Sequence, residues 1–137
     1  MKALRCTHVY KVFGKDPDRA VEHLKAGGSR ADLPDDVTVA VDDVTLEIEE
    51  GEIFVVMGLS GSGKSTLLRT LNALGPATSG TIHIGDQEIT GMSLKEIRKL
   101  REERMSMVFQ HFGLLPHRTV LENAAYPLEI QKVPRAE

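Results

Sequence analysis

The sequence has little of several features, and each shortage excludes a class of protein. Cys6 is the single cysteine among 137 residues, which excludes an internal disulfide and fits a reducing compartment. No stretch approaches the ~18 consecutive apolar residues of a membrane span, and the N-terminus has no apolar signal-peptide segment. Basic charge is not in excess, because 17 Lys and Arg stand against 20 Asp and Glu, which argues against nucleic-acid binding through bulk charge. These absences predict a soluble intracellular protein.

The composition nevertheless supplies enough apolar material for a folded core. Hydrophobic residues make up 41% and charged residues 27% of the chain, close to the averages for soluble domains. The length also falls in the commonest range for one domain. We therefore expect a folded domain and not a disordered segment.

The first third of the chain predicts an antiparallel part with a helical insertion. Residues 2–13 mix β-branched and aromatic side chains, which is typical of a strand. A short helix should begin at Asp16 and Pro17 and end at Gly27 and Gly28, within a surface insertion spanning about residues 15–36. Residues 37–41 and 44–48 then predict two short edge strands, separated by a solvated turn at Asp42 and Asp43.

The rest of the chain alternates apolar runs with amphipathic helices. The unbroken apolar runs at residues 53–57 and 105–109 predict strands buried on both faces. A helix is expected over residues 64–74, with its leucines on one face. Smaller expected elements are a strand at 81–84 and two helices that start at the capping boxes Ser93/Glu96 and Thr119/Glu122, the second kinked or ended near Pro127.

The most specific motif is GLSGSGKS at residues 58–65, which matches G-x-x-x-x-G-K-[ST] without a mismatch. Its glycines let the backbone wrap closely around a polyphosphate, so that successive N–H groups point inward. A helix that begins near Lys64 adds further N–H donors and the positive end of its dipole. The dinucleotide pattern G-x-G-x-x-G fails, because Thr66 stands where the last Gly or Ala belongs. The motif thus predicts a nucleoside triphosphate site.

Each position of this phosphate loop has an expected role. Lys64 should reach the β- and γ-phosphates, Ser65 should hold Mg²⁺ through its hydroxyl, and Thr66 can donate a further hydrogen bond. A glycine- and serine-rich turn that matches by chance is disfavoured by the predicted buried strand before it and the amphipathic helix after it. The predicted ATP-binding residues of the loop are Gly58, Leu59, Ser60, Gly61, Ser62, Gly63, Lys64, Ser65 and Thr66.

The loop and its flanks resemble a known family. Residues 57–69 (MGLSGSGKSTLLR), with 48–58 (IEEGEIFVVMG) before and 106–129 (SMVFQHFGLLPHRTVLENAAYPLE) after, are similar to the ATP-binding subunits of ABC transporters. The insertion after residues 9–15 (VYKVFGK) is most similar to the glycine betaine/proline importers. The resemblance implies an α/β fold: a P-loop NTPase core of the ABC ATPase type with an antiparallel β edge subdomain over residues 1–110, and an incomplete helical subdomain over 111–137.

The resemblance also implies two site residues outside the loop. Gln110 stands at the family's Q-loop position, where glutamine contacts Mg²⁺ and the attacking water, so it joins Lys64 as an expected catalytic residue. By spacing alone the favoured interpretation of Gln110 is an ordinary surface glutamine, because glutamine is mostly exposed. Phe13 stands at the aromatic position that stacks on adenine, since a π-face is all that stacking needs. Phe13 could instead fill the core, with Tyr10 as the stacking residue.

Several family motifs do not follow within this sequence. The signature loop, the Walker B aspartate, the catalytic glutamate after it and the switch histidine have no counterpart. The run from Val39 to Asp43 imitates Walker B but precedes the phosphate loop. The five histidines show no pairing at zinc-ligand spacing. We therefore expect an N-terminal fragment, truncated before the Walker B strand, that does not hydrolyse ATP by itself and is poorly stable.

The resemblance implies an ATPase subunit that energises an importer, with ATP and Mg²⁺ as cofactors. The implied transport substrates are glycine betaine, proline or related osmolytes. The implied partners are membrane-spanning permease subunits, a second ATP-binding subunit and, indirectly, a substrate-binding protein, with a peripheral position at the cytoplasmic face of the plasma membrane. Two alternatives stay open: a nucleotide-binding module without catalysis, and a soluble ABC ATPase that acts on nucleic acid, which the acidic balance disfavours.

Overall fold

The computed structural model describes residues 1–110 and 113–134. The chain forms two compact units, Met1–Arg98 and Lys99–Glu137. The domain boundary expected between residues 110 and 111 stays a prediction. Among the described residues, no helix combines the length and the apolar character needed to cross a bilayer.

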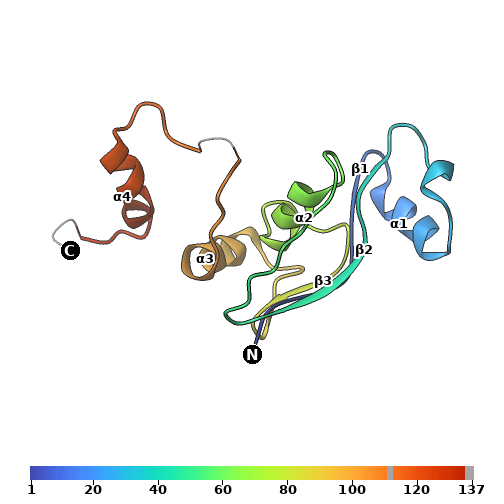
Figure 1. Ribbon diagram of the computed structural model, residues 1–137, viewed down its shortest axis with the longest axis horizontal. Coiled ribbons are helices and arrows are strands. Elements are labelled where there is room, and N and C mark those ends of the chain that lie inside the picture. Colours follow the sequence, from blue (N-terminus) through green and yellow to red (C-terminus); the bar gives the residue numbers. More distant parts are fainter. Residues whose placement is uncertain (111–112, 135–137) are drawn as a thin grey trace. The chain divides into compact units, whose positions relative to one another are not determined.

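The first unit is built on one antiparallel sheet whose long central strand has partners on both sides (Figure 1). The sheet order is β2-β1-β3-β4, and its strands are β1 (Lys2–Phe13), β2 (Thr38–Glu49), β3 (Ser79–Ile84) and β4 (Gln87–Glu88). β1 pairs with β2 from Lys2 opposite Glu49 to Phe13 opposite Thr38. The predictions of strands at residues 2–13 and 81–84 and of an edge position for residues 37–48 are confirmed.

β2 is one continuous strand, so the predicted turn at Asp42 and Asp43 is wrong. The pairing with β1 shifts register between Val9 and Lys11, where the strands bulge. Asp43 there has a positive φ of 50°, and its carboxylate lies 2.7 Å from Nδ1 of His8. A bulge absorbs the extra residue and re-aims its side chain. The two acidic residues therefore interrupt the ladder locally without ending the strand.

The helical insertion predicted between β1 and β2 is present. It consists of α1 (Pro17–Lys25) and a single 3-10 turn, η1 (Arg30–Asp32), and Figure 1 shows it at the closed end of the β1–β2 hairpin. α1 buries Ala20 and Val21 against Tyr10 and Val12 of β1, and further apolar residues pack around this cluster: Leu24, Leu33, Val37 and Val39. Asp16 occupies the expected N-cap position, but its side chain forms no capping hydrogen bond.

The helix after the phosphate loop, α2 (Lys64–Leu71), is three residues shorter than predicted. Ala73 adopts a positive φ of 50°, and the N–H of Leu74 donates to the carbonyl of Arg69, a pairing typical of helix ends. Leu67 and Leu71 are buried. Leu74 instead leaves the helical path, so the predicted stripe of leucines is only partly realised.

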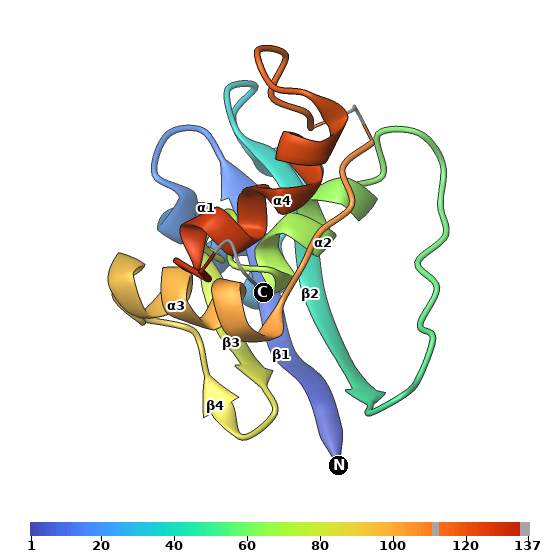
Figure 2. The ribbon, with the colours of Figure 1, turned by 90° about the vertical axis from the view of Figure 1, so that its left-hand side faces the viewer.

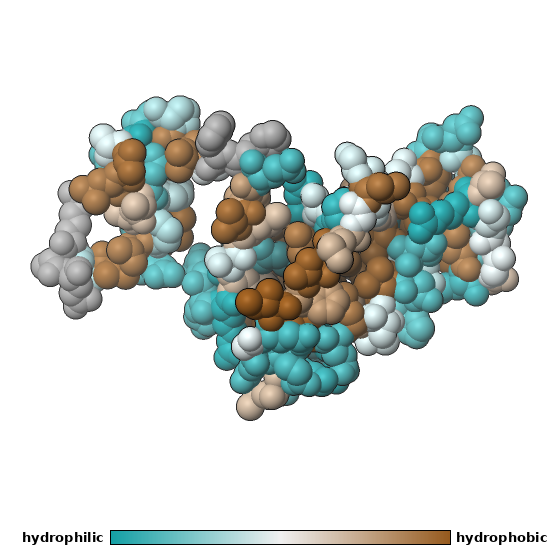
Figure 3. All heavy atoms as spheres, in the orientation of Figure 1, coloured by the Kyte–Doolittle hydropathy of each residue, from teal (hydrophilic) through white to brown (hydrophobic). Residues whose placement is uncertain are grey.

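The apolar runs at residues 53–57 and 105–109 do not form strands in the described structure. Figure 2 shows residues 50–63 as a long loop between β2 and α2, and Ile53 is 91% exposed while Val108 is 96% exposed. A strand needs a neighbouring strand to pair with its N–H and C=O groups, and no described strand lies beside either run. Figure 3 shows apolar side chains open to solvent on the first unit. The exposed apolar residues of this unit include Ile53, Val55 and Met57.

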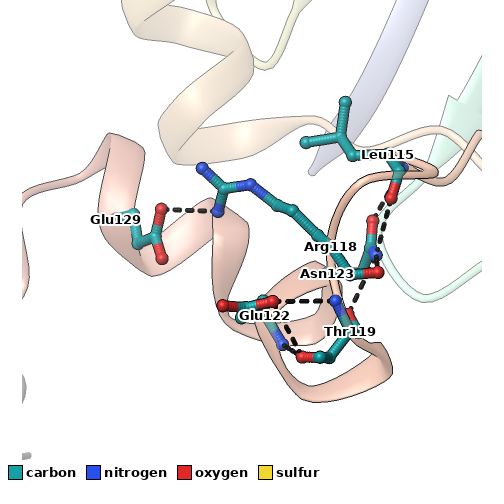
Figure 4. A network of polar contacts seen from close by, with 6 residues as sticks. All are labelled: Leu115, Arg118, Thr119, Glu122, Asn123 and Glu129. Carbon is teal, nitrogen blue, oxygen red and sulfur yellow. Dashed lines mark hydrogen bonds and ion pairs between the residues drawn. The ribbon is translucent and has the colours of Figure 1, made fainter.

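The two predicted capping boxes begin the remaining helices. Ser93 and Glu96 start α3 (Leu94–Arg104). In the second unit, Thr119 and Glu122 start α4 (Val120–Ile130), with each side chain accepting a hydrogen bond from the other's backbone N–H. Figure 4 shows this capping box together with an ion pair, in which Nη1 of Arg118 lies 2.7 Å from Oε2 of Glu129. Pro127 lies inside α4, so it does not end the helix.

We expect Val21→Ala to lower the free energy of unfolding by about 2 kcal/mol, because it removes buried methyl groups and leaves a cavity. Val21 is 3% exposed in α1. Val120→Ala is the matched control, because Val120 also lies in a helix but is 87% exposed, and it should change stability by less than about 0.5 kcal/mol. Urea unfolding followed by circular dichroism measures both; equal effects would contradict the packing of α1 on β1.

Candidate functional site

The phosphate-loop motif lies between the end of β2 and the first turn of α2. Gly63 is the N-cap of α2 and no side chain caps the helix. Within residues 1–110 and 113–134, no hydrogen bond is found for the backbone N–H groups of Gly61, Gly63, Lys64 and Ser65. Such unused donors at a helix start, together with the helix dipole, form a site for an anion.

Gly63 joins this loop to the sheet through a very close backbone approach. Its φ is +90°, and a Cβ placed there would lie 2.1 Å from the carbonyl oxygen of Ala40 in β2. A residue with a side chain would have to push the loop away from the strand. The glycine at this position therefore decides how closely the first turn of α2 sits against β2.

The Lys64 side chain folds back over the loop. Its ammonium nitrogen donates to the carbonyl oxygen of Gly58 at 2.8 Å, to that of Leu59 at 2.5 Å, and to the Ser62 hydroxyl at 3.3 Å. These contacts hold a positive charge at the centre of the loop. At this position the ammonium can exchange its neutral acceptors for phosphate oxygens, because charged acceptors form stronger hydrogen bonds with it.

A cavity of about 320 Å³ lies over the start of α2 and brings Phe13 to the loop. It is lined by Phe13, Thr38, Val39, Ala40 and residues 61–66. Phe13 is 48% exposed, so it does not fill the core, and Nζ of Lys11 lies 5.0 Å from its ring centroid. Tyr10, the alternative stacking residue, is only 5% exposed. Burial, with the charges of Asp43 and Asp42, raises the pKa of the Tyr10 phenol.

A second cavity of about 370 Å³ shares residues 61–64 of the loop and is also lined by Arg30 and Asp42. Arg30 could not be predicted from the sequence, because an arginine in a polar, turn-rich insertion has no spacing signal that points to the loop. Only the return of the insertion toward β2 places it there. Arg30 pairs with Asp42, as Nε and Nη2 each donate to Oδ2 at 2.8 Å.

The residues predicted to hold Mg²⁺ come from different parts of the chain. Ser65 lies in the first turn of α2, and its exposed hydroxyl forms no hydrogen bond within the described residues. Gln110 occupies an exposed bend of the second unit, and its part in a metal site stays a prediction. Over the described parts of the chain, no group of three or more His, Cys, Asp or Glu side chains could hold a metal ion.

Comparison with known proteins gives consistent matches. The profile described as ABC transporter matches residues 41–137. The glycine betaine transport ATP-binding protein OpuAA of Bacillus subtilis (strain 168) is 46% identical over 98% of this chain and 32% of its own length. The methionine import ATP-binding protein MetN 2 of Bacillus cereus (strain ATCC 10987 / NRS 248) is 58% identical over 72% of this chain and 29% of its own.

A solved structure shares the same architecture. A dimeric ATP-binding cassette in a post-hydrolysis state, bound to ADP and Pi, superposes with a TM-score of 0.75 at 30% identity, covering 93% of this chain and 47% of the cassette. The chain thus spans about a third of the length of these curated relatives. The match confirms the predicted type of α/β fold.

We expect Gly63→Ala to destabilise the nucleotide-free protein by about 3 kcal/mol, because it adds a backbone clash to an unfavourable positive φ. Gly61→Ala is the matched control. Gly61 has a φ of +78° with no atom within 4 Å of an added Cβ, so only the conformational cost of about 1 kcal/mol applies. Thermal unfolding without nucleotide measures both, and equal losses would contradict the close contact with Ala40.

Proposed function

Because the chain belongs to the ABC transporter family, we propose that it binds Mg-ATP through residues 58–66 and forms part of an ATP-hydrolysing importer subunit. The observation that carries the proposal is the set of unused N–H donors at the start of α2 beside the Lys64 ammonium. Donors of this kind, fixed before the ligand arrives, stabilise phosphate charge without reorganisation.

The loop would hold the polyphosphate by two kinds of contact. The N–H groups of Gly61, Gly63, Lys64 and Ser65 would donate to phosphate oxygens. The ammonium of Lys64 would leave the carbonyls of Gly58 and Leu59 and bind the β- and γ-phosphates, where a full negative charge replaces neutral acceptors. Thr66, which follows in the first turn of α2, would add a hydroxyl donor.

The nucleoside would lie in the cavity that joins Phe13 to the loop. The half-exposed ring of Phe13 offers a face for adenine stacking, and such stacking contributes about 1–3 kcal/mol per base. Lys11, which contacts this ring, would either move aside or sit on the opposite face. In this arrangement the base lies beside Phe13, and the phosphates lie at residues 61–64, which line both this cavity and the second one.

Among the described residues of the loop, Ser65 carries a hydroxyl that suits Mg²⁺ and stands in the first turn of α2. Its hydroxyl is the type of oxygen ligand that Mg²⁺ accepts in P-loop proteins, with phosphate oxygens and waters completing the shell. When bound, Mg²⁺ would neutralise phosphate charge. Gln110 would add an amide oxygen and help to orient the attacking water, as the family resemblance implies.

The relatives support the proposed transport role. OpuAA, a glycine betaine transport ATP-binding protein, matches 98% of this chain, whereas the methionine import relative matches 72%. We therefore propose glycine betaine, proline or a related osmolyte as the transported class. The whole protein would act at the cytoplasmic face of the membrane with a second ATP-binding subunit and permease subunits, and would contact a substrate-binding protein only indirectly.

A second candidate, nucleotide binding without hydrolysis, has one observation in its favour for this chain. The cavity that joins Phe13 to the loop has no Asp or Glu in its lining, so none of its residues can act as a general base for the attacking water. Asp42, which lines the second cavity, is already paired with Arg30. Under this alternative the 137 residues hold ATP, and hydrolysis requires groups from outside them.

We expect Lys64→Ala to weaken ATP binding about tenfold to a hundredfold, because hydrogen bonds from a charged donor contribute about 1.5–3 kcal/mol. Isothermal titration with Mg-ATP measures this change. Lys15→Ala is the control, since Lys15 lines a different cavity, within the insertion, and should leave affinity unchanged. An unchanged affinity in Lys64→Ala would overturn the proposed site.

We also expect no ATP hydrolysis by the purified 137-residue chain above the rate of its Lys64→Ala variant. The reason is that the cavity between Phe13 and the loop has no carboxylate in its lining, and that Asp42 in the second cavity is paired with Arg30. Release of inorganic phosphate at saturating Mg-ATP is the measurement. Turnover that disappears on Lys64→Ala would show that the chain itself supplies the catalytic groups.

A further inference from the structure

The helical insertion returns to the phosphate loop and places a second cation beside it. Arg30 belongs to η1, at the far end of the insertion from α1. It lines the cavity of about 370 Å³ that also contains residues 61–64 of the loop. The charged residues that line this cavity are Arg30, Lys64 and Asp42, so positive charge exceeds negative charge at the loop.

The backbone that carries Arg30 is held by its own capping contacts. The Ser29 hydroxyl accepts a hydrogen bond from the N–H of Ala31 at 3.2 Å, and the Asp32 carboxylate accepts one from the N–H of Ser29 at 3.1 Å. Leu33, which follows directly, packs against the apolar cluster under α1. Arg30 is therefore presented from an ordered turn, which lowers the entropy cost of placing its side chain.

The contact with Asp42 leaves part of the guanidinium available. Nε and Nη2 both donate to the single oxygen Oδ2, and among the described residues the other guanidinium donors have no partner. Arg30 is exposed and Asp42 is half-buried. An arginine held on one edge in this way can offer its other edge to a second anion, and its planar fork suits phosphate oxygens.

We propose that Arg30 is a further polyphosphate-binding residue, which the insertion carries to the phosphate loop and Asp42 holds in place. The inference rests on the proposed ATP site. Nucleoside di- and triphosphates would gain more from Arg30 than a monophosphate does, because they bring more negative charge to a cavity lined by two cations. The rival interpretation is a purely structural ion pair that fastens the insertion to β2.

The experiment compares Arg30→Gln with the wild-type chain for binding of Mg-ATP and of AMP. We expect ATP affinity to fall about tenfold and AMP affinity to change by less than about twofold. The wild-type preference for ATP over AMP should shrink accordingly. Arg19→Gln is the matched control, because it removes the same charge from α1 of the same insertion, and Arg19 lines the cavity within the insertion that Lys15 also lines.

Each outcome decides between the two interpretations. A lower melting temperature with an unchanged ratio of ATP to AMP affinity would overturn the proposal in favour of a structural pair. Should Arg30→Gln fail to fold, Arg30→Lys decides instead: it keeps the charge but loses the fork, so the ratio should fall about threefold, and an unchanged ratio would overturn the proposal. If Lys64→Ala also leaves ATP binding intact, the proposed function itself has failed; if only the Arg30 variants do, the inference alone has failed.

Discussion

The site depends on one backbone contact, the approach of Gly63 to the carbonyl of Ala40 in β2. This contact sets the start of α2 against the sheet, and the start of α2 is where the unused N–H donors lie. Because protein interiors are close-packed, a loop at this distance has little freedom to shift. The orientation of the donors therefore follows from the sheet and not from the loop alone.

The β1–β2 hairpin carries the remaining parts of the site into place around this contact. Phe13 pairs with Thr38 where the hairpin closes, and the next two residues of β2 line the same cavity as the loop. The helical insertion leaves the hairpin after Phe13 and returns to it at Thr38. Its cluster of apolar residues fixes α1 on β1, and its 3-10 turn brings Arg30 to Asp42.

Two apolar runs are exposed in a chain that is much shorter than its ABC transporter relatives. The chain spans about a third of the length of the curated relatives described above. Residues 53–57 and 105–109 have the composition of strands that are covered on both faces, yet no described strand pairs with them. An apolar composition makes a segment suitable for burial on both faces. Forming a strand also needs neighbouring strands for its backbone hydrogen bonds, and those neighbours are distant in sequence.

The amino-acid sequence determined the local features whose causes lie within a few residues. The strand at residues 2–13, the capping boxes at Ser93 and Thr119, and the phosphate-loop motif at 58–65 all depend on short spacings, and the structure contains the two capping boxes and the strand as expected. The ABC ATPase type of fold was also readable, because the motif and its flanks are specific to that family.

Tertiary structure alone decided the features that depend on distant residues. It joined the two short strands expected around Asp42 into one bulged strand, because pairing with β1 continues past the irregularity. It made Phe13, and not Tyr10, the accessible ring, because α1 covers one and the hairpin end exposes the other. It also placed Arg30 at the loop, because the insertion packs back along β2, a contact between residues 12 positions apart that no local pattern encodes.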